Sequence, residues 1–124
     1  FVHFIAGAFV GASPKTFYND FLESLAEECE AIMVATPYKL TFDYDSMASD
    51  TSGKFGQVVD ELAMQDPTLK DFPSAAVGHS CGALLHTLLA VADGRHEAYI
   101  LMAFNNKPVS DAIPVPLPPP PEDA

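Results

Sequence analysis

Basic residues are scarce in this chain. Lys and Arg total 6 against 17 Asp and Glu, which gives a formal net charge of −11 at pH 7. No stretch of the sequence gathers the basic residues into a cluster. Because contacts with phosphate groups need Lys and Arg, this shortage argues against binding of nucleic acid or of an anionic lipid surface. The partners that remain are neutral small molecules and proteins that offer basic patches.

Long apolar runs and metal-ligand spacings are also missing. The longest apolar run, Ala98 to Phe104, is far shorter than the roughly 20 residues that a membrane span requires. The two cysteines, Cys29 and Cys81, lie in unlike contexts and are predicted to be free thiols. No set of His, Cys or carboxylate residues has ligand spacing, so neither a metal nor a cofactor is expected. The chain begins at Phe1 without a recognisable leader, which suggests a processed or truncated protein without a visible targeting signal.

Apolar strand-like runs alternate with helical patterns along the chain. Continuous apolar strands separated by helices indicate a parallel sheet covered on both faces. The predicted fold class is therefore α/β, with about four mainly parallel strands in a core domain over residues 1–112. Residues 113–124 hold six of the 11 prolines and predict an extended, acidic, proline-rich tail. The predicted strands are 2–6, 31–36, 74–78 and 98–104, and the predicted helices are 15–29, 54–65 and 81–92.

Apolar spacing also predicts which helix faces are buried. Recurrence at three and four residues gives an inward stripe to the first two helices. An acidic stretch between the second strand and the second helix is predicted to be a solvated loop, with a displaced catalytic acid as the alternative. The inward residues are Phe17, Phe21, Leu22, Leu25 and Ala26 in the first helix and Phe55, Val58, Val59 and Leu62 in the second, and the acidic stretch contains Asp43, Asp45 and Asp50.

The most informative segment is Ala76 to Leu85. It combines an apolar strand, the pattern Gly-x-Ser-x-Gly over 78–82, and the start of an amphipathic helix. That context predicts a nucleophile elbow, in which the central serine occupies a sharp, strained turn and the flanking glycines leave room for neighbouring backbone. Ser80 is therefore the candidate catalytic nucleophile.

The elbow and several other segments together resemble the α/β-hydrolases, and in particular a family of hydrolase-like proteins of cyanobacteria, algae and plant plastids. The resemblance covers about residues 1–114 and implies a partial α/β-hydrolase core, with strand order second, first, third, fourth. It also implies a plastid location, with a thylakoid photosynthetic complex as one candidate. The segments that carry it are Phe4 to Ala12, Ala35-Thr36-Pro37-Tyr38, Phe42-Asp43, Gly78 to Gly82 with Leu85-His86, and Phe104-Asn105-Asn106 followed by Ala112-Ile113-Pro114.

A hydrolase would need an oxyanion hole beside Ser80. The backbone N–H of Cys81 would supply one donor, and the loop after the first strand, with Gly7, Ala8 and Phe9, would supply the other. The Cys81 thiol has two interpretations: a reactive group with a lowered pKa at a helix N-terminus, or a small residue packed beside the turn.

The positions of the histidines argue against a complete catalytic triad in this chain. The fold supplies its triad in the order Ser, acid, His, and no histidine follows His96. His3 is predicted to have a core or edge role, His79 to point away from Ser80, and His86 to pack beneath the sheet. The last of the four, His96, is expected at the opposite end of the sheet. None is placed as the base that Ser80 needs.

The predicted outer strands add a second argument. Residues 31–36 and 98–104 would be long apolar sheet edges, which soluble monomers avoid. The leading hypothesis is therefore a catalytically incomplete hydrolase-like protein that acts as an interaction or assembly subunit, its edges covered by protein partners and any membrane association peripheral. The alternative is a serine esterase or lipase-type enzyme for a neutral or lipid ester, with the acid and His supplied by further sequence or by a partner. A ligand-binding module that uses the pocket near Phe9 and Ser80 is the third hypothesis.

Overall fold

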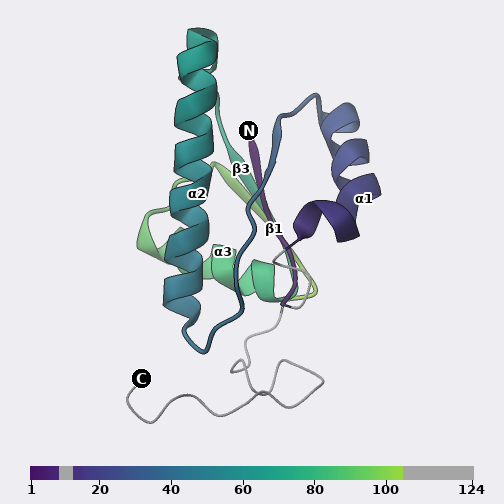
Figure 1. Cartoon of the computed structure of the whole chain (residues 1–124), viewed down its shortest axis with the longest axis vertical. Coiled ribbons are helices and arrows are strands. Elements are labelled where there is room, and N and C mark those ends of the chain that lie inside the picture. The colour runs from purple at the N-terminus through teal and green to yellow at the C-terminus, as the bar shows by residue number, and fades with distance from the viewer. Residues whose placement is uncertain (9–12, 105–124) are drawn as a thin grey trace.

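The computed structural model of the chain describes residues 1–8 and 13–104 (Figure 1). Strands and helices alternate along this part of the chain, as the apolar pattern predicts. The predicted tail, 113–124, lies outside the described residues. The elements in chain order are β1 (Val2–Ile5), α1 (Pro14–Cys29), β2 (Met33–Ala35), α2 (Tyr44–Gln65), the 3-10 turn η1 (Pro67–Leu69), β3 (Ala75–His79), α3 (Cys81–Ala92) and β4 (Ala98–Met102).

The four strands form one parallel sheet in the order β2-β1-β3-β4, which confirms the predicted fold class and strand order. In register, Val2 pairs with Met33 on one side and with Ala75 on the other, and Ala75 pairs with Ala98. All four carboxyl ends therefore meet at one edge of the sheet. Residues that follow β1 and β3 are brought together there, although more than 60 positions separate them in the sequence.

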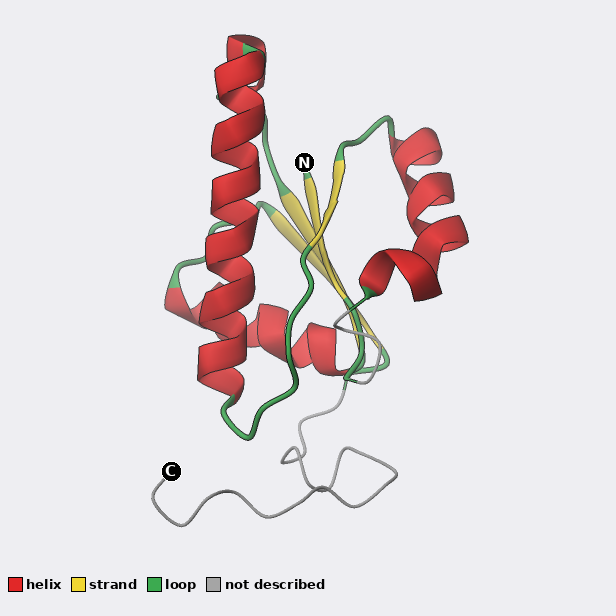
Figure 2. Ribbon diagram, in the orientation of Figure 1, coloured by secondary structure: helices red, strands yellow, loops and turns green. Residues whose placement is uncertain are grey.

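The helices cover the sheet from both sides: α1 lies on one face, and α2 and α3 lie on the other (Figure 2). Alternation along β1 builds the two cores, because successive side chains point to opposite faces. Phe4 packs with Leu22 and Val77 on the α1 side. Ile5 packs with Leu85 on the other side, within the cluster shared by α2 and α3.

Helix α2 begins at Tyr44, ten residues before the predicted start at Lys54. The Asp43 carboxylate accepts a hydrogen bond from the Ser46 N–H at 3.2 Å and caps the helix. Ser, Thr, Asp and Gly form helices weakly, and their abundance over 45–53 concealed this first half. Burial of Met47 and Thr51 stabilises it. The prediction of an acidic loop was thus wrong, since Asp45 and Asp50 belong to the helix.

The predicted inward stripes were partly wrong. Phe17 is 63% exposed and Val58 is 36% exposed. Helix α1 contacts the sheet instead through Tyr18, Leu22 and Leu25, which surround Phe4 and Val77. The buried side of α1 is therefore rotated away from Phe17. Periodicity established that the helix has an apolar face, but the docking of the helix decided which members of that face are covered.

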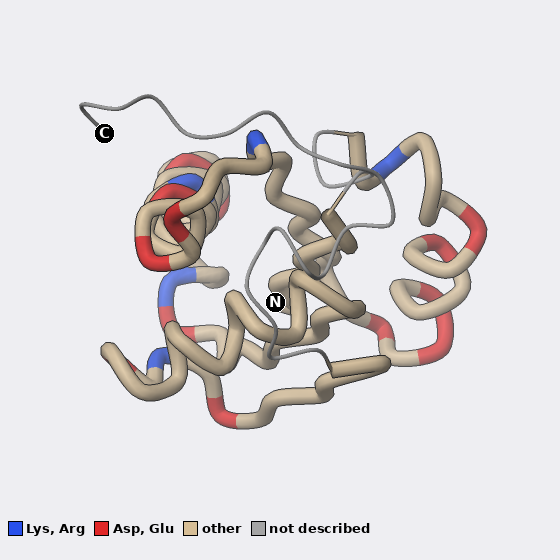
Figure 3. The backbone as a smooth tube through the Cα atoms, turned by 90° about the horizontal axis from the view of Figure 1, so that it is seen from below, with Lys and Arg blue, Asp and Glu red and all other residues tan. Residues whose placement is uncertain are grey.

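Asp and Glu residues are distributed along α1 and α2, the two helices at opposite sides of the view in Figure 3. Those of α1, for example Asp20, Glu23 and Glu27, are exposed. No described helix has both the length and the apolar content needed to cross a bilayer.

Candidate functional site

Ser80 connects β3 to α3 in a strained backbone conformation, with φ 56° and ψ −115°. Positive φ is uncommon outside glycine, and such strain persists only where the surroundings hold it. Here the Ser80 N–H donates to the Met102 carbonyl at 2.8 Å, and the Ser80 carbonyl accepts from the Ala83 N–H at 3.0 Å. Strand β4 and the first turn of α3 thus fix the turn from both sides.

The two glycines of the pattern are required by close backbone approach. A Cβ on Gly82 would overlap the Ile5 carbonyl oxygen at the end of β1. A Cβ on Gly78 would lie 2.6 Å from the Gly82 carbonyl oxygen and 2.7 Å from the Ala83 nitrogen. The missing side chains let α3 start directly against β1 and β3. The sequence pattern is therefore a packing requirement of this strand–turn–helix junction.

The loop after β1 lies beside Ser80. A Cβ built on Gly7 would be 3.7 Å from Ser80 Cβ. Ala8 follows and packs against the core cluster that contains Ile5 and Cys81. Phe9, the third residue predicted for this half of the oxyanion hole, lies outside the described residues. The structure therefore brings Gly7 close to Ser80.

The two parts of the predicted oxyanion hole differ in the state of their N–H donors. The Gly7 N–H already has a hydrogen-bond acceptor, whereas the Cys81 N–H lies at the start of a helix. The Gly7 N–H donates to the Tyr18 hydroxyl oxygen at 3.3 Å. Cys81 is the first residue of α3, so its N–H has no acceptor one turn back within the helix. The helix dipole adds partial positive charge at the same point. The Cys81 N–H is thus the donor best suited to a developing negative charge.

Tyr18 is a site residue that the sequence argument missed. Its hydroxyl lies 2.8 Å from His79 Nδ1 and accepts from Gly7, so it joins α1 to both loops beside Ser80. His79 is therefore directed toward α1. The signal for Tyr18 was its i, i+4 and i+7 relation to Leu22 and Leu25, which places all three on one helix face.

A general base for Ser80 is not found in the part of the chain that the structure describes. Within 1–8 and 13–104, the Ser80 hydroxyl makes no side-chain hydrogen bond. His79 is bonded to Tyr18, and the other three histidines lie elsewhere: His3 in the middle of β1, His86 within α3, and His96 before β4. His96 thus sits at the edge of the sheet opposite Ser80.

The Cys81 thiol fits the packed interpretation. Cys81 is 6% exposed, and burial raises the pKa of its thiol, an effect that the neighbouring Tyr38 hydroxyl partly offsets. The Tyr38 hydroxyl donates to the Ala6 carbonyl at 2.7 Å, and burial raises the pKa of this phenol as well. Cys29 is an exposed free thiol and Cys81 a buried one. The thiol beside Ser80 therefore stays protonated at neutral pH.

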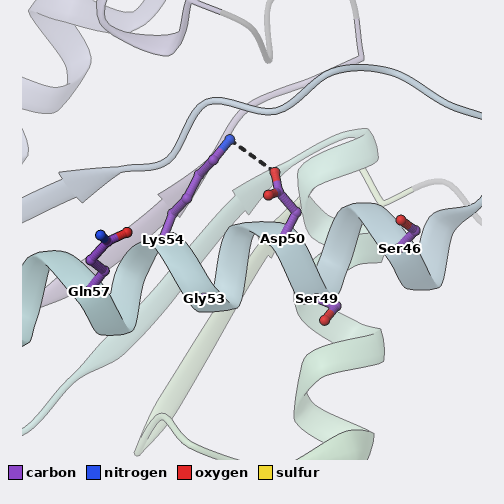
Figure 4. Close-up of a pocket in the computed structure, with 6 residues that line it drawn as sticks. All are labelled: Ser46, Ser49, Asp50, Gly53, Lys54 and Gln57. Atoms are coloured by element: carbon purple, nitrogen blue, oxygen red, sulfur yellow. Dashed lines mark ion pairs between the residues drawn. The ribbon is translucent and has the colours of Figure 1, made fainter.

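Among the described residues, the acidic side chains that follow β2 do not form a second site. Asp43 caps α2, and Asp50 pairs with Lys54 at 2.9 Å along the same helix (Figure 4). The pocket whose lining residues that figure labels is formed by α2 alone: Ser46, Ser49, Asp50, Gly53, Lys54 and Gln57. Side chains from one face of one helix do not enclose a ligand, since binding sites are concave and draw on several elements. The Ser80 turn therefore remains the principal candidate.

These features define an α/β protein whose parallel sheet presents a strained serine turn at its carboxyl edge. The family model described as "Protein of unknown function (DUF1350)" matches residues 1–117. The chain belongs to this family. No curated protein and no solved structure matches the chain.

Proposed function

We propose that Ser80 is the nucleophile of a serine hydrolase of the α/β-hydrolase type, acting on a neutral or lipid ester. The observation that supports this proposal is the Ser80 backbone, with φ 56° and ψ −115°, at a strand–turn–helix junction. A glycine would adopt this conformation without strain. The presence of serine at this position, where glycine would fit without strain, is therefore better explained by a role of its hydroxyl group than by a requirement of the turn.

In the proposed reaction, Ser80 Oγ attacks the ester carbonyl carbon while a base takes the hydroxyl proton. The Oγ–carbon bond forms, and the carbonyl oxygen becomes an oxyanion that the Cys81 N–H stabilises. Collapse of this intermediate breaks the bond to the alcohol, which leaves with the proton held by the base. Water then attacks the acyl-enzyme in the same way, which releases the carboxylic acid and restores the Ser80 hydroxyl. The catalytic carboxylate and the histidine base are assigned to further sequence or to a partner.

The net charge supports a neutral substrate. At −11 the chain repels anions, and no basic side chain has a described contact with the Ser80 turn. A plastid location, with a thylakoid complex as one host, remains part of this proposal and is supported by the resemblance described under the sequence.

The proposal predicts that a fluorophosphonate probe forms an adduct on Ser80 in the native full-length protein. The adduct should disappear on denaturation and in Ser80→Ala, as mapped by mass spectrometry. Ser80→Gly should also lose the adduct, yet it should raise the free energy of unfolding by about 1 kcal/mol, because glycine relieves the strain.

The two variants separate chemistry from folding. A native protein that never labels, beside a control hydrolase that does, would reject the proposal. A Ser80→Gly variant that is less stable than Ser80→Ala would show that the serine itself supports the turn, which would remove the argument from strain.

A second candidate function, an interaction or assembly subunit, is favoured by the apolar surface of the sheet beside α1. Ile100 in β4 is 55% exposed, and Phe72, which lines the same groove, is 50% exposed. A groove of about 590 Å³ extends from Leu25 in α1 past Val77 to Ile100. Large exposed apolar patches mark surfaces that contact another protein or another segment. The partner of this surface would be an apolar protein face that continues the sheet or covers it.

Replacement of Ile100 by Asp tests this second function. In the full-length protein the change should dissociate the native complex, observed as a smaller particle on size-exclusion chromatography of the plastid extract. Val91→Asp is the matched control, because Val91 is 85% exposed on α3, away from the groove. An unchanged particle with Ile100→Asp would reject the interaction function.

A further inference from the structure

Three of the four histidines, far apart in the sequence, meet on the side of the sheet that α2 and α3 cover. His3 comes from β1, His86 from α3, and His96 from the segment before β4. One ring nitrogen from each lies within 4.8 Å of the others. The ring centroids of His3 and His86 are 4.7 Å apart, and those of His3 and His96 are 5.5 Å apart. All three side chains are buried.

In each ring, one nitrogen lies within hydrogen-bond distance of an oxygen atom that orients the ring. His86 Nε2 donates to the His3 carbonyl at 2.9 Å. His3 Nε2 lies 2.8 Å from Thr36 Oγ1, and His96 Nδ1 lies 2.8 Å from Ser74 Oγ. Histidines that bind metal ions almost always have their second nitrogen bonded to such an oxygen, which fixes the ring and its tautomer. Each ring of the cluster thus has one hydrogen bond that fixes its orientation.

His86 has a bare lone pair in this cluster. A carbonyl oxygen only accepts, so the His86 proton is on Nε2, and Nδ1 carries none in the neutral ring. His86 is 0% exposed, and Nδ1 has no hydrogen-bond partner among the described residues. Buried polar atoms without partners are rare, and each one calls for an explanation, such as an ion.

We propose that His3, His86 and His96 bind a divalent transition-metal ion, with zinc as the first candidate. Three imidazole nitrogens are an established ligand set for zinc, at about 2.1 Å from the ion. Nitrogens around one tetrahedral ion are roughly 3.4 Å apart, so the rings need to close by no more than about 1.4 Å. The Phe55 ring, stacked on His3 at 4.5 Å, covers the cluster from α2.

Such an ion would join β1, α3 and the segment before β4, near the edge of the sheet opposite Ser80. Its effect would be on stability, because binding to the folded chain alone shifts the folding equilibrium. Arg95, which lies 4.8 Å over the Phe55 ring, contributes a positive charge that opposes the ion. Arg95→Met should therefore tighten metal binding, while removing no histidine.

The test uses the full-length protein, freed of metal by a chelator and then titrated with Zn²⁺ and separately with Co²⁺. Wild type should bind about one zinc ion per chain, and Co²⁺ should give the strong visible absorption of a tetrahedral site. His96→Gln should abolish that absorption, since glutamine leaves the loop a hydrogen-bonding group but no imidazole. His79→Gln is the matched control, because it removes the histidine outside the cluster.

Ser74→Ala provides a variant that keeps all three ligands and removes only a half-buried hydroxyl group. Loss of the oxygen that orients His96 should weaken zinc binding by about 10–100-fold. A wild type without stoichiometric zinc and without the cobalt absorption would overturn the proposal. So would equal binding by His96→Gln and wild type, or loss of binding in His79→Gln in place of His96→Gln.

Discussion

Gly82→Ala is expected to lower the free energy of unfolding by at least about 3 kcal/mol. The added Cβ would overlap the Ile5 carbonyl oxygen and lie 2.8 Å from that of Ala6. Both contacts are with backbone, so no side-chain rotation relieves them. Helix α3 would have to move away from β1, which would separate Leu85 from Ile5 in the core. Urea unfolding followed by circular dichroism measures the effect.

Gly53→Ala is the matched control for this experiment. Gly53 is an exposed residue of α2, and nothing lies within 4 Å of a Cβ placed there. The same chemical change should therefore raise the free energy of unfolding by about 0.5–1 kcal/mol, since alanine restricts the unfolded chain and favours the helix. Equal effects of the two substitutions would mean that the close approach at Gly82 is not present in solution.

Phe55→Ala is expected to lower the free energy of unfolding by about 3–5 kcal/mol. Phe55 is 1% exposed and packs with Phe1 and Val34 between α2 and the sheet. Its ring also stacks on His3 with centroids 4.5 Å apart. Removal would leave a cavity next to the histidine cluster, because the backbone on either side belongs to regular elements that cannot collapse into it.

Phe17→Ala on α1 is the control for this second prediction. Phe17 is 63% exposed, so its truncation should change the free energy of unfolding by no more than about 0.5 kcal/mol. Thermal unfolding of both variants in the full-length protein measures the difference. A large loss in Phe17→Ala would indicate that another segment or a partner covers this face of α1.

Periodicity was reliable where one type of residue dominated a segment. The apolar run before Gly78 and the continuous apolar pattern from Cys81 to Ala92 predicted β3 and α3 almost residue for residue. It failed at the start of α2, where Ser, Asp and Gly are weak helix formers and burial of Met47 and Thr51 stabilises the helix. That burial depends on α3, which lies more than 30 residues further along the chain.

One part of the candidate site could likewise be predicted from local sequence, and another part could not. Gly-x-Ser-x-Gly after a strand predicts a strained turn from local sequence, because only glycines admit so close an approach. Tyr18, by contrast, reaches the turn only because α1 docks on the face of the sheet next to the turn. Nothing in the spacing of positions 18 and 79 indicates a contact between them.

The sequence by itself determined the alternation of strands and helices, the parallel sheet and the turn at Ser80, because each follows from local apolar periodicity and from glycine positions. Only the tertiary structure decided which face of α1 is buried, and that His3, His86 and His96 meet. Their separations of 83 and 10 residues match no ligand spacing. They converge because β1, α3 and the segment before β4 pack together, and packing between distant elements is not encoded in the order of neighbouring residues.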